Sequence, residues 1–340
     1  MTATRAPFGL TDAVRFARSK NASDLHVEAG SPAAVRIDGV LTPVDGTPLT
    51  ASDVEALAAE LFGARPMRAD EGDASIAWCD DELGTLRGHA FRSLAGIALA
   101  VRLFPRAIPA LESLDLPPSV TAFTEHPRGL VLIAGPTGSG KSTTLAAIVD
   151  RINARAAKRI VTIEDPIEYR HHNRRSFVTQ REIGRDTPSL EAALHGVLRC
   201  DPDVIVVGEL RDGGAIRAAL TAAETGHLVL ATVHTGDAPQ TVDRIVDSFE
   251  GAAAAQVRAQ LASVLLGVTC QRLVRRADGK GRRAVAEVMV GTEGVRNLIR
   301  DGKTHQLGNA IATGRRYGMQ TLAQHIAELE QSRVILEGVA

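Results

Sequence analysis

The stretch Gly135-Pro-Thr-Gly-Ser-Gly-Lys141-Ser142 constrains this chain more than any other part of its sequence. It fits the pattern GxxxxGK[ST] in full, follows an apolar run at 129–134 and precedes a segment with a helical pattern. Its glycines let backbone N–H groups converge on an oxyanion, and a helix N-terminus adds further N–H donors. The sequence therefore predicts a strand–loop–helix unit that binds the phosphates of a nucleotide.

Each polar residue of this loop has an expected part in nucleotide binding. We expect Lys141 to reach the terminal phosphates and the Ser142 hydroxyl to bind Mg²⁺. The predicted cofactors are therefore ATP and Mg²⁺. The candidate nucleotide-binding residues are Gly135, Pro136, Thr137, Gly138, Ser139, Gly140, Lys141, Ser142 and Thr143.

After residue 128 the chain alternates short apolar runs with helical patterns. The apolar runs lie at 129–134, 160–163, 204–207 and 228–232. Unbroken Val, Ile and Leu runs separated by helices are typical of a parallel sheet covered on both faces. Further on, the spacing of apolar residues predicts one long helix over 250–271, and the tail at 293–336 has the pattern of short helices.

The first third of the chain has a different pattern. Two helical segments are predicted at 11–20 and 52–61, among short strands, and Asp38-Gly39 is a hairpin signal. These features predict a small α+β module with an antiparallel sheet. Between residues 104 and 118 the chain has four prolines and no helical or strand periodicity of apolar residues, which is typical of a linker.

We therefore divide the chain into three parts. The predicted parts are a first domain at 1–104, a linker at 105–118 and an ATPase domain at 119–340.

Composition disfavours several other classes of protein. The net charge is −1 and only 3% of residues are aromatic, which argues against a nucleic-acid translocase and predicts no nucleic-acid partner. The three cysteines are far apart, so they provide neither a disulfide framework nor a Cys-x-x-Cys metal site. No segment approaches the ~18 apolar residues of a spanning helix. We expect a cytoplasmic protein that inserts nowhere into a membrane and reaches one only through a partner.

Two glutamates follow predicted strands of the sheet. Glu164 comes directly after the run at 160–163, and Glu209 comes shortly after the run at 204–207. Carboxylates at the carboxyl ends of parallel strands lie in the ligand crevice of such sheets. Glu164 is a candidate to orient or deprotonate the attacking water, and Glu209 is a candidate Mg²⁺-side carboxylate. An acidic strand end is also typical of a solvated turn.

Histidines and arginines supply further candidates. His227 and His234 flank one apolar strand, so they are expected at its opposite ends and not at a shared metal. His234, at the carboxyl end, is the better candidate to contact the γ-phosphate, although a lone histidine is often structural. Arg87 and Arg102 lie in the first module, where a solvated arginine is common, but a neighbouring subunit often supplies an arginine for phosphoryl transfer.

Four blocks of sequence stand in one order: GPTGSGKST, TIEDPIEY, DPDVIVVGELRD and AAETGHLVLATVHTGDA. They resemble the Walker A, Asp-box, Walker B and His-box motifs of the secretion and type IV pilus ATPase superfamily. Further stretches, VTQREIGRDT and AIATGRRYGMQTL among them, resemble its PilT-like subgroup of pilus retraction ATPases. The resemblance runs from about residue 23 to residue 329.

The resemblance implies a PAS-like α+β domain before a RecA-like P-loop domain with a mainly parallel sheet. It also implies a homohexameric ring whose nucleotide sites are completed by a neighbouring subunit. The catalytic residues that it implies are the Asp-box Glu164, the Walker B Glu209, the His-box pair His227 and His234, and the arginines Arg87 and Arg102.

The function implied by the resemblance is an ATPase motor for type IV pilus retraction and twitching motility. Such a ring acts on an inner-membrane platform protein, affects pilin only indirectly and lies at the inner face of the cytoplasmic membrane.

Thr85 stands where an arginine is usual in the family, and Leu94-Ala95 replaces a polar Asn-Arg pair. These departures leave open an accessory paralogue with low turnover. The extension ATPases carry a tetracysteine zinc motif, which three cysteines exclude.

Overall fold

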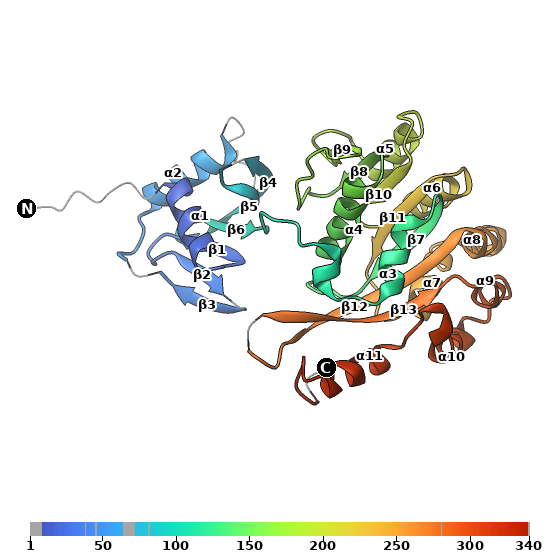
Figure 1. Ribbon diagram of the computed structural model, residues 1–340. Coiled ribbons are helices and arrows are strands. Elements are labelled where there is room, and N and C mark those ends of the chain that lie inside the picture. The colour runs from blue at the N-terminus through green and yellow to red at the C-terminus, as the bar shows by residue number, and fades with distance from the viewer. Residues whose placement is uncertain are drawn as a thin grey trace, which may run out of the picture. The chain divides into compact units, whose positions relative to one another are not determined.

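In the computed structural model the chain forms two compact units, and Figure 1 shows the chain as a ribbon. The first unit is Met1–Ala107 with Pro166–Arg170, and the second is Ile108–Asp165 with His171–Ala340. For Cys79 and Asp80 only the backbone is described. The structure describes residues 9–37, 39–44, 46–63, 72–80, 82–279 and 281–338.

The first unit contains a six-stranded antiparallel sheet with strand order β3-β2-β1-β6-β5-β4. Its strands are β1 (Asp24–Glu28), β2 (Ala34–Ile37), β3 (Val40–Pro43), β4 (Asp73–Asp80), β5 (Gly84–Ser93) and β6 (Gly96–Leu103). The predicted hairpin is present, because Ile37 pairs with Val40, although Asp38 itself lies outside the described residues. The antiparallel sheet predicted from the sequence is confirmed.

Two helices, α1 (Leu10–Ser19) and α2 (Ala51–Phe62), pack on one face of this sheet. Thr50 and Asp53 form a capping box at the start of α2, so two otherwise unpaired N–H groups are satisfied. Along β1 the buried residues alternate with partly exposed ones, since Leu25 and Val27 face the helices. On β1 the opposite face carries the polar residues Asp24, His26 and Glu28.

The second unit contains a seven-stranded sheet with strand order β13-β12-β7-β11-β10-β8-β9. All neighbours pair in parallel except β12 and β13, which are antiparallel. This agrees with the predicted mainly parallel sheet. The strands are β7 (Gly129–Ala134), β8 (Arg159–Glu164), β9 (Phe177–Glu182), β10 (Val204–Val207), β11 (Leu228–Val233), β12 (Leu265–Arg275) and β13 (Arg282–Val290).

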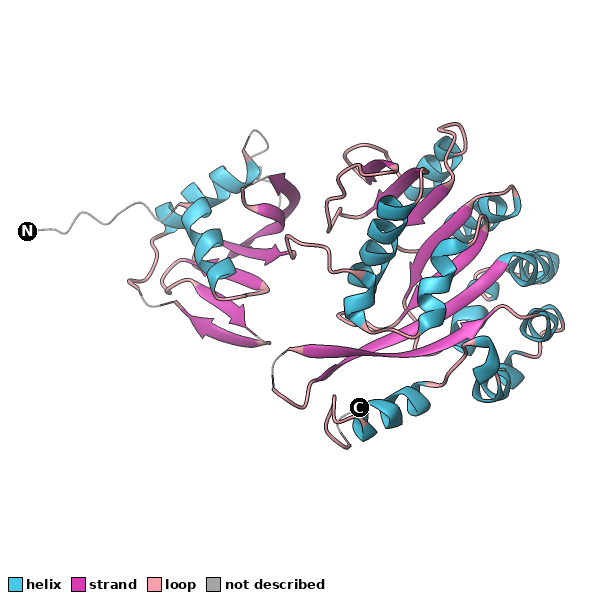
Figure 2. Cartoon of the chain, viewed as in Figure 1, coloured by secondary structure: helices cyan, strands magenta, loops and turns pink. Residues whose placement is uncertain are grey.

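Helices cover both faces of this sheet, and Figure 2 shows them on either side of the strands. The helices are α3 (Pro118–Ala122), α4 (Lys141–Arg155), α5 (Leu190–Val197), α6 (Gly213–Glu224), α7 (Ala238–Val246), α8 (Gly251–Val264), α9 (Glu293–Arg300), α10 (Leu307–Thr313) and α11 (Leu322–Gln331). Short 3-10 turns lie at η1 (Leu111–Leu114), η2 (Phe123–Glu125), η3 (Thr304–Gln306) and η4 (Arg315–Tyr317).

Two separate hydrophobic clusters account for the apolar runs of the sequence. Leu130 and Leu132 of β7 belong to the cluster beneath α5–α8, whereas Val131 and Ile133 belong to the cluster beneath α4. Consecutive residues of a strand point to opposite faces, so a strand buried on both faces must be apolar throughout. Leu111, within the predicted linker, is buried in the cluster beneath α4.

The long helix predicted over residues 250–271 is wrong. The helix α8 ends at Val264, and the chain continues directly as β12 from Leu265. Here the strand is buried beside β7, and a short apolar run buried on both sides has no periodicity that separates helix from strand. The β-branched Val268 and Thr269 fit a strand better than a helix.

Candidate functional site

The carboxyl ends of four parallel strands bring most of the predicted site residues to one edge of the second unit's sheet. The phosphate loop follows β7, Glu164 ends β8, Glu209 follows β10 and His234 follows β11. The pairing of Ala134 with Val233 aligns the ends of β7 and β11. This edge is where open α/β sheets bind ligands.

The phosphate loop has the backbone that its glycines predict. Gly135, Gly138 and Gly140 all have positive φ, at 147°, 78° and 86°. A Cβ on Gly135 would lie 2.3 Å from the carbonyl oxygen of Gln271, so no other residue fits there. The loop tip at 136–138 is exposed.

Lys141 begins α4 and is almost fully buried, with its ammonium folded back onto the loop. Its Nζ donates to the carbonyl oxygens of Gly135 at 2.8 Å and Pro136 at 2.9 Å. These bonds hold the ammonium against the loop backbone at the N-terminus of α4. The arrangement suits an anionic phosphate chain.

Gln271 of β12 braces the loop from behind, and the sequence analysis missed it. Its buried side-chain Nε2 donates to the carbonyl oxygen of Ser139 at 2.7 Å. The two residues are 132 positions apart, so no local pattern links them. The assignment of 250–271 to a helix also hid the contact.

Glu209 lies between a histidine and an arginine. Arg211 Nε donates to Glu209 Oε2 at 2.9 Å, and His234 Nε2 lies 3.5 Å from Glu209 Oε1. Arg211 also reaches Asp165 Oδ2 at 3.3 Å. The hydrogen bond to Glu209 is the main cause that raises the pKa of Arg211 above its usual value. Asp212 does not pair with Arg211, because its carboxylate caps α6.

Glu164 is partly buried, and two side chains from its own strand and the neighbouring strand hold its carboxylate. Thr162 Oγ1 donates to Glu164 Oε1 at 2.7 Å, and Gln180 Nε2 donates to the same oxygen at 3.0 Å. Both donors belong to the paired strands β8 and β9. The sequence alone did not indicate either of them.

His227 lies at the amino end of β11, away from the other site residues. Its ring Nδ1 is 2.9 Å from the carbonyl oxygen of Ala222 and 3.2 Å from Thr225 Oγ1. Its backbone carbonyl accepts a hydrogen bond from Gly129, the first residue of β7. Within a single subunit His227 therefore lies away from the phosphate loop. The spacing of the two histidines predicted this placement at opposite ends of the strand.

The two arginines of interest lie together on the first unit. Arg87 of β5 and Arg102 of β6 are directly opposite each other in the antiparallel register, and both are exposed. Arg102 Nε lies 3.0 Å from Asp24 Oδ1 on β1. Cross-strand partners share a face of the sheet, so this face carries a pair of guanidinium groups.

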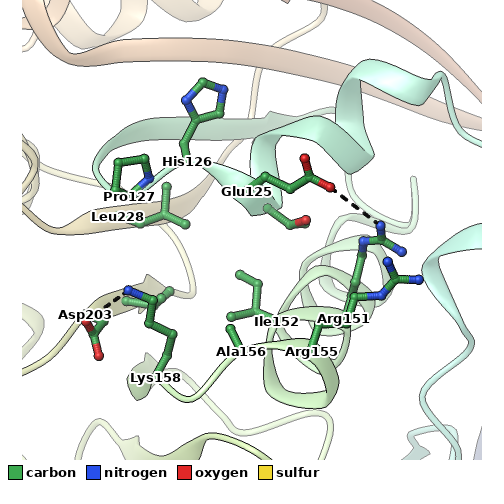
Figure 3. Close-up of a pocket in the computed structure, with 12 residues that line it drawn as sticks. Glu125, His126, Pro127, Arg151, Ile152, Arg155, Ala156, Lys158, Asp203 and Leu228 are labelled. Atoms are coloured by element: carbon green, nitrogen blue, oxygen red, sulfur yellow. Dashed lines mark hydrogen bonds and ion pairs between the residues drawn. The ribbon is translucent and has the colours of Figure 1, made fainter.

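A cavity of about 310 Å³ lies at the opposite edge of the second unit's sheet and is shown in Figure 3. Val204 and Leu228, the first residues of β10 and β11, line it. Its walls include the ion pair between Lys158 and Asp203, with N and O atoms 3.2 Å apart. It therefore lies at the amino ends of the strands, at the opposite edge from the phosphate loop.

Comparison with known proteins places this chain in a family. Residues 86–334 match the family model described as type II/IV secretion system protein. The chain belongs to that family. The predicted resemblance to secretion and pilus ATPases is therefore confirmed.

Two curated relatives match this chain along nearly their whole length. The type IV pilus retraction ATPase PilT of Pseudomonas aeruginosa is 42% identical over 92% of this chain and 91% of its own. The uncharacterised protein YggR of Escherichia coli K12 is 44% identical over 93% of this chain and 96% of its own.

A solved structure supports the same fold for this family member. The crystal structure of the pilus retraction motor PilT with bound ADP has a TM-score of 0.88 at 38% identity, and the match covers 97% of this chain and 95% of that one. The α/β fold predicted from the sequence is confirmed. The chain is an ATPase that uses a nucleotide. Among the residues that the structure describes, no helix is long and apolar enough to cross a membrane.

The brace on the phosphate loop generates a first prediction. Gln271→Met keeps the volume of the side chain but leaves the buried carbonyl oxygen of Ser139 without its donor, which costs about 1–3 kcal/mol. If the ordered loop is needed for binding, affinity for a fluorescent ATP analogue falls about tenfold or more. Gln260→Met, which removes a surface hydrogen bond of α8, is the control. Unchanged affinity in Gln271→Met would show that the loop needs no brace.

Proposed function

We propose that this chain is the subunit of a hexameric ring that hydrolyses ATP to power retraction of type IV pili. The observation that carries the proposal is the 42% identity to the retraction ATPase PilT over nearly the full length of both chains. The proposed partner is an inner-membrane platform protein, and pilin subunits leave the fibre only as an indirect result. The ring works in the cytoplasm, held at the inner face of the membrane by that partner.

The phosphate loop is the proposed nucleotide site. Its backbone N–H groups and the Lys141 ammonium hold the phosphates of ATP. Ser142 and Glu209 would hold Mg²⁺, and their hydroxyl and carboxylate oxygens are donors that fit this ion, which keeps water and phosphate oxygens as its other ligands. When bound, the metal neutralises charge on the terminal phosphates.

Glu164, Glu209 and His234 form the proposed hydrolytic group. Glu164 orients or deprotonates the attacking water, and the two donors on its Oε1 support that role by fixing the carboxylate. His234 contacts the γ-phosphate from a position beside Glu209. For His227 we propose a role at the boundary with another subunit, since it lies at the other edge of its own sheet.

Arg87 and Arg102 are the proposed arginines that a neighbouring subunit supplies. Positive charge near the γ-phosphate lowers the barrier to phosphoryl transfer. Their position as exposed cross-strand partners supports the proposal, because both guanidinium groups can reach one phosphate chain.

Mechanical work requires that hydrolysis changes the arrangement of two domains. We propose that the first domain, 1–104, rotates against the ATPase domain, 119–340, about the linker at 105–118. Hinge segments of this kind absorb the change in backbone dihedral angles during domain motion.

One observation favours a second candidate, an accessory ring subunit with low turnover. Thr85 stands at a position where the family usually has arginine. It is buried, and its uncharged side chain cannot form an ion pair with a phosphate. Leu94, which replaces a polar residue, is fully exposed at the turn between β5 and β6. The first unit therefore offers fewer charged groups than a retraction motor of the usual pattern.

The retraction function predicts a phenotype in cells. Replacing the native gene with Glu209→Gln should leave ATP binding intact and slow hydrolysis by about a hundredfold, so pili extend but do not retract. We expect pili to accumulate on the surface and twitching to stop, as seen by electron microscopy and motility assays. Normal twitching despite slowed hydrolysis would contradict the retraction proposal, whereas normal twitching with normal hydrolysis would reassign Glu209.

Mixed rings test whether the arginines act between subunits. Rings of Glu209→Gln alone and of Arg102→Ala alone should both hydrolyse ATP slowly. Mixed rings contain some interfaces where an intact Glu209 meets an intact Arg102, so part of the activity returns. Mixing Arg102→Ala with the double variant is the control and should restore nothing. If native mass spectrometry shows mixed rings and no activity returns, Arg102 does not act between subunits.

A further inference from the structure

The side-chain amide of Gln180 contacts two groups that flank one loop. On one side its Nε2 donates to Glu164 Oε1 at 3.0 Å, and on the other its Oε1 accepts from the backbone N–H of His171 at 2.8 Å. The chain leaves β8 after Glu164 and passes through His171 before β9 begins at Phe177. One amide therefore connects the two ends of the loop at 165–170.

These contacts fix the orientation of the amide. A backbone N–H can only donate, so the atom that faces His171 must be the oxygen of Gln180. The NH₂ group must then face Glu164, as a carboxylate requires. The register holds the residues in place, because Gln180 is the Cα partner of Thr162 and Glu182 is the partner of Glu164.

One oxygen of Glu164, Oε1, accepts hydrogen bonds from both Thr162 and Gln180. Thr162, which is buried, donates at 2.7 Å from β8, and Gln180 donates from β9. Two donors on one oxygen restrict rotation of the carboxylate about its terminal bond. Hydrogen bonds to a charged acceptor are also stronger than those between neutral groups.

We infer that Gln180 is a positioning residue for ATP hydrolysis, which acts by holding the Glu164 carboxylate in one orientation while closing the base of the 165–170 loop. The inference rests on the proposed role of Glu164 toward the attacking water. Small errors in the position of a reacting group cost about a hundredfold in rate. Gln180 acts through Glu164, to which it donates.

A purely structural role for Gln180 makes a different prediction, and one substitution separates the two. Gln180→Glu keeps an oxygen that can accept from His171, so the loop can still close. It replaces the donor to Glu164 with a second carboxylate, which repels it. A positioning role predicts loss of turnover in this variant, whereas loop closure alone predicts normal turnover.

The experiment measures steady-state ATP hydrolysis and binding of a fluorescent ATP analogue on the purified full-length protein. We expect Gln180→Glu to lower kcat about tenfold to a hundredfold with KM and analogue affinity unchanged. Thr179→Ala, at the neighbouring residue on the opposite face of β9, is the control and should match the wild type. Gln180→Met removes both the donor to Glu164 and the acceptor for His171 without adding charge. If Gln180→Glu fails to fold, Gln180→Met carries the test through the double-mutant cycle with Glu164→Gln.

A double-mutant cycle connects the effect to Glu164. In a Glu164→Gln background, Gln180→Glu should lower kcat no further, because both changes disable the same group. Unchanged kcat in the Gln180 variants, or a full additional loss in the double variant, would overturn the inference. Normal turnover in Glu164→Gln alone would instead refute the proposed role of Glu164, so the two failures are distinguishable.

Discussion

The bonds from the Lys141 ammonium to the carbonyl oxygens of Gly135 and Pro136 are the contacts on which the candidate nucleotide site depends. They hold a positive charge at the N-terminus of α4, where backbone N–H groups already favour an anion. The path of the loop depends in turn on Gly135, whose missing side chain leaves room for the backbone of β12. A strand far along the chain thus sets the geometry of the phosphate site.

The sheet places the carboxylates of the site, and side chains within its strands or just beyond their ends orient them. Glu209 is held between Arg211 and His234, while Glu164 is held by Thr162 and Gln180. Both glutamates keep their place because parallel strands end together at one edge. The proposed hydrolytic group therefore depends on the register between β8, β9, β10 and β11.

Much of this could be predicted from the sequence, because the informative residues are close together along the chain. The phosphate loop is a continuous motif, and Glu164 directly follows an apolar run that forms a buried strand. Gln180 and Gln271 could not be predicted, because their partners lie 16 and 132 positions away and no period connects them. The strand β12 was mistaken for helix because burial on both faces removes the pattern that separates the two.

The central claim is that Lys141 and the loop around it grip the triphosphate that drives this ATPase. The most direct measurement compares steady-state ATP turnover and nucleotide affinity of the purified protein with those of Lys141→Ala. We predict that Lys141→Ala loses at least about a hundredfold in turnover and binds ATP far more weakly, while circular dichroism shows the variant still folded. Turnover equal to the wild type, with the variant folded, would contradict the central claim.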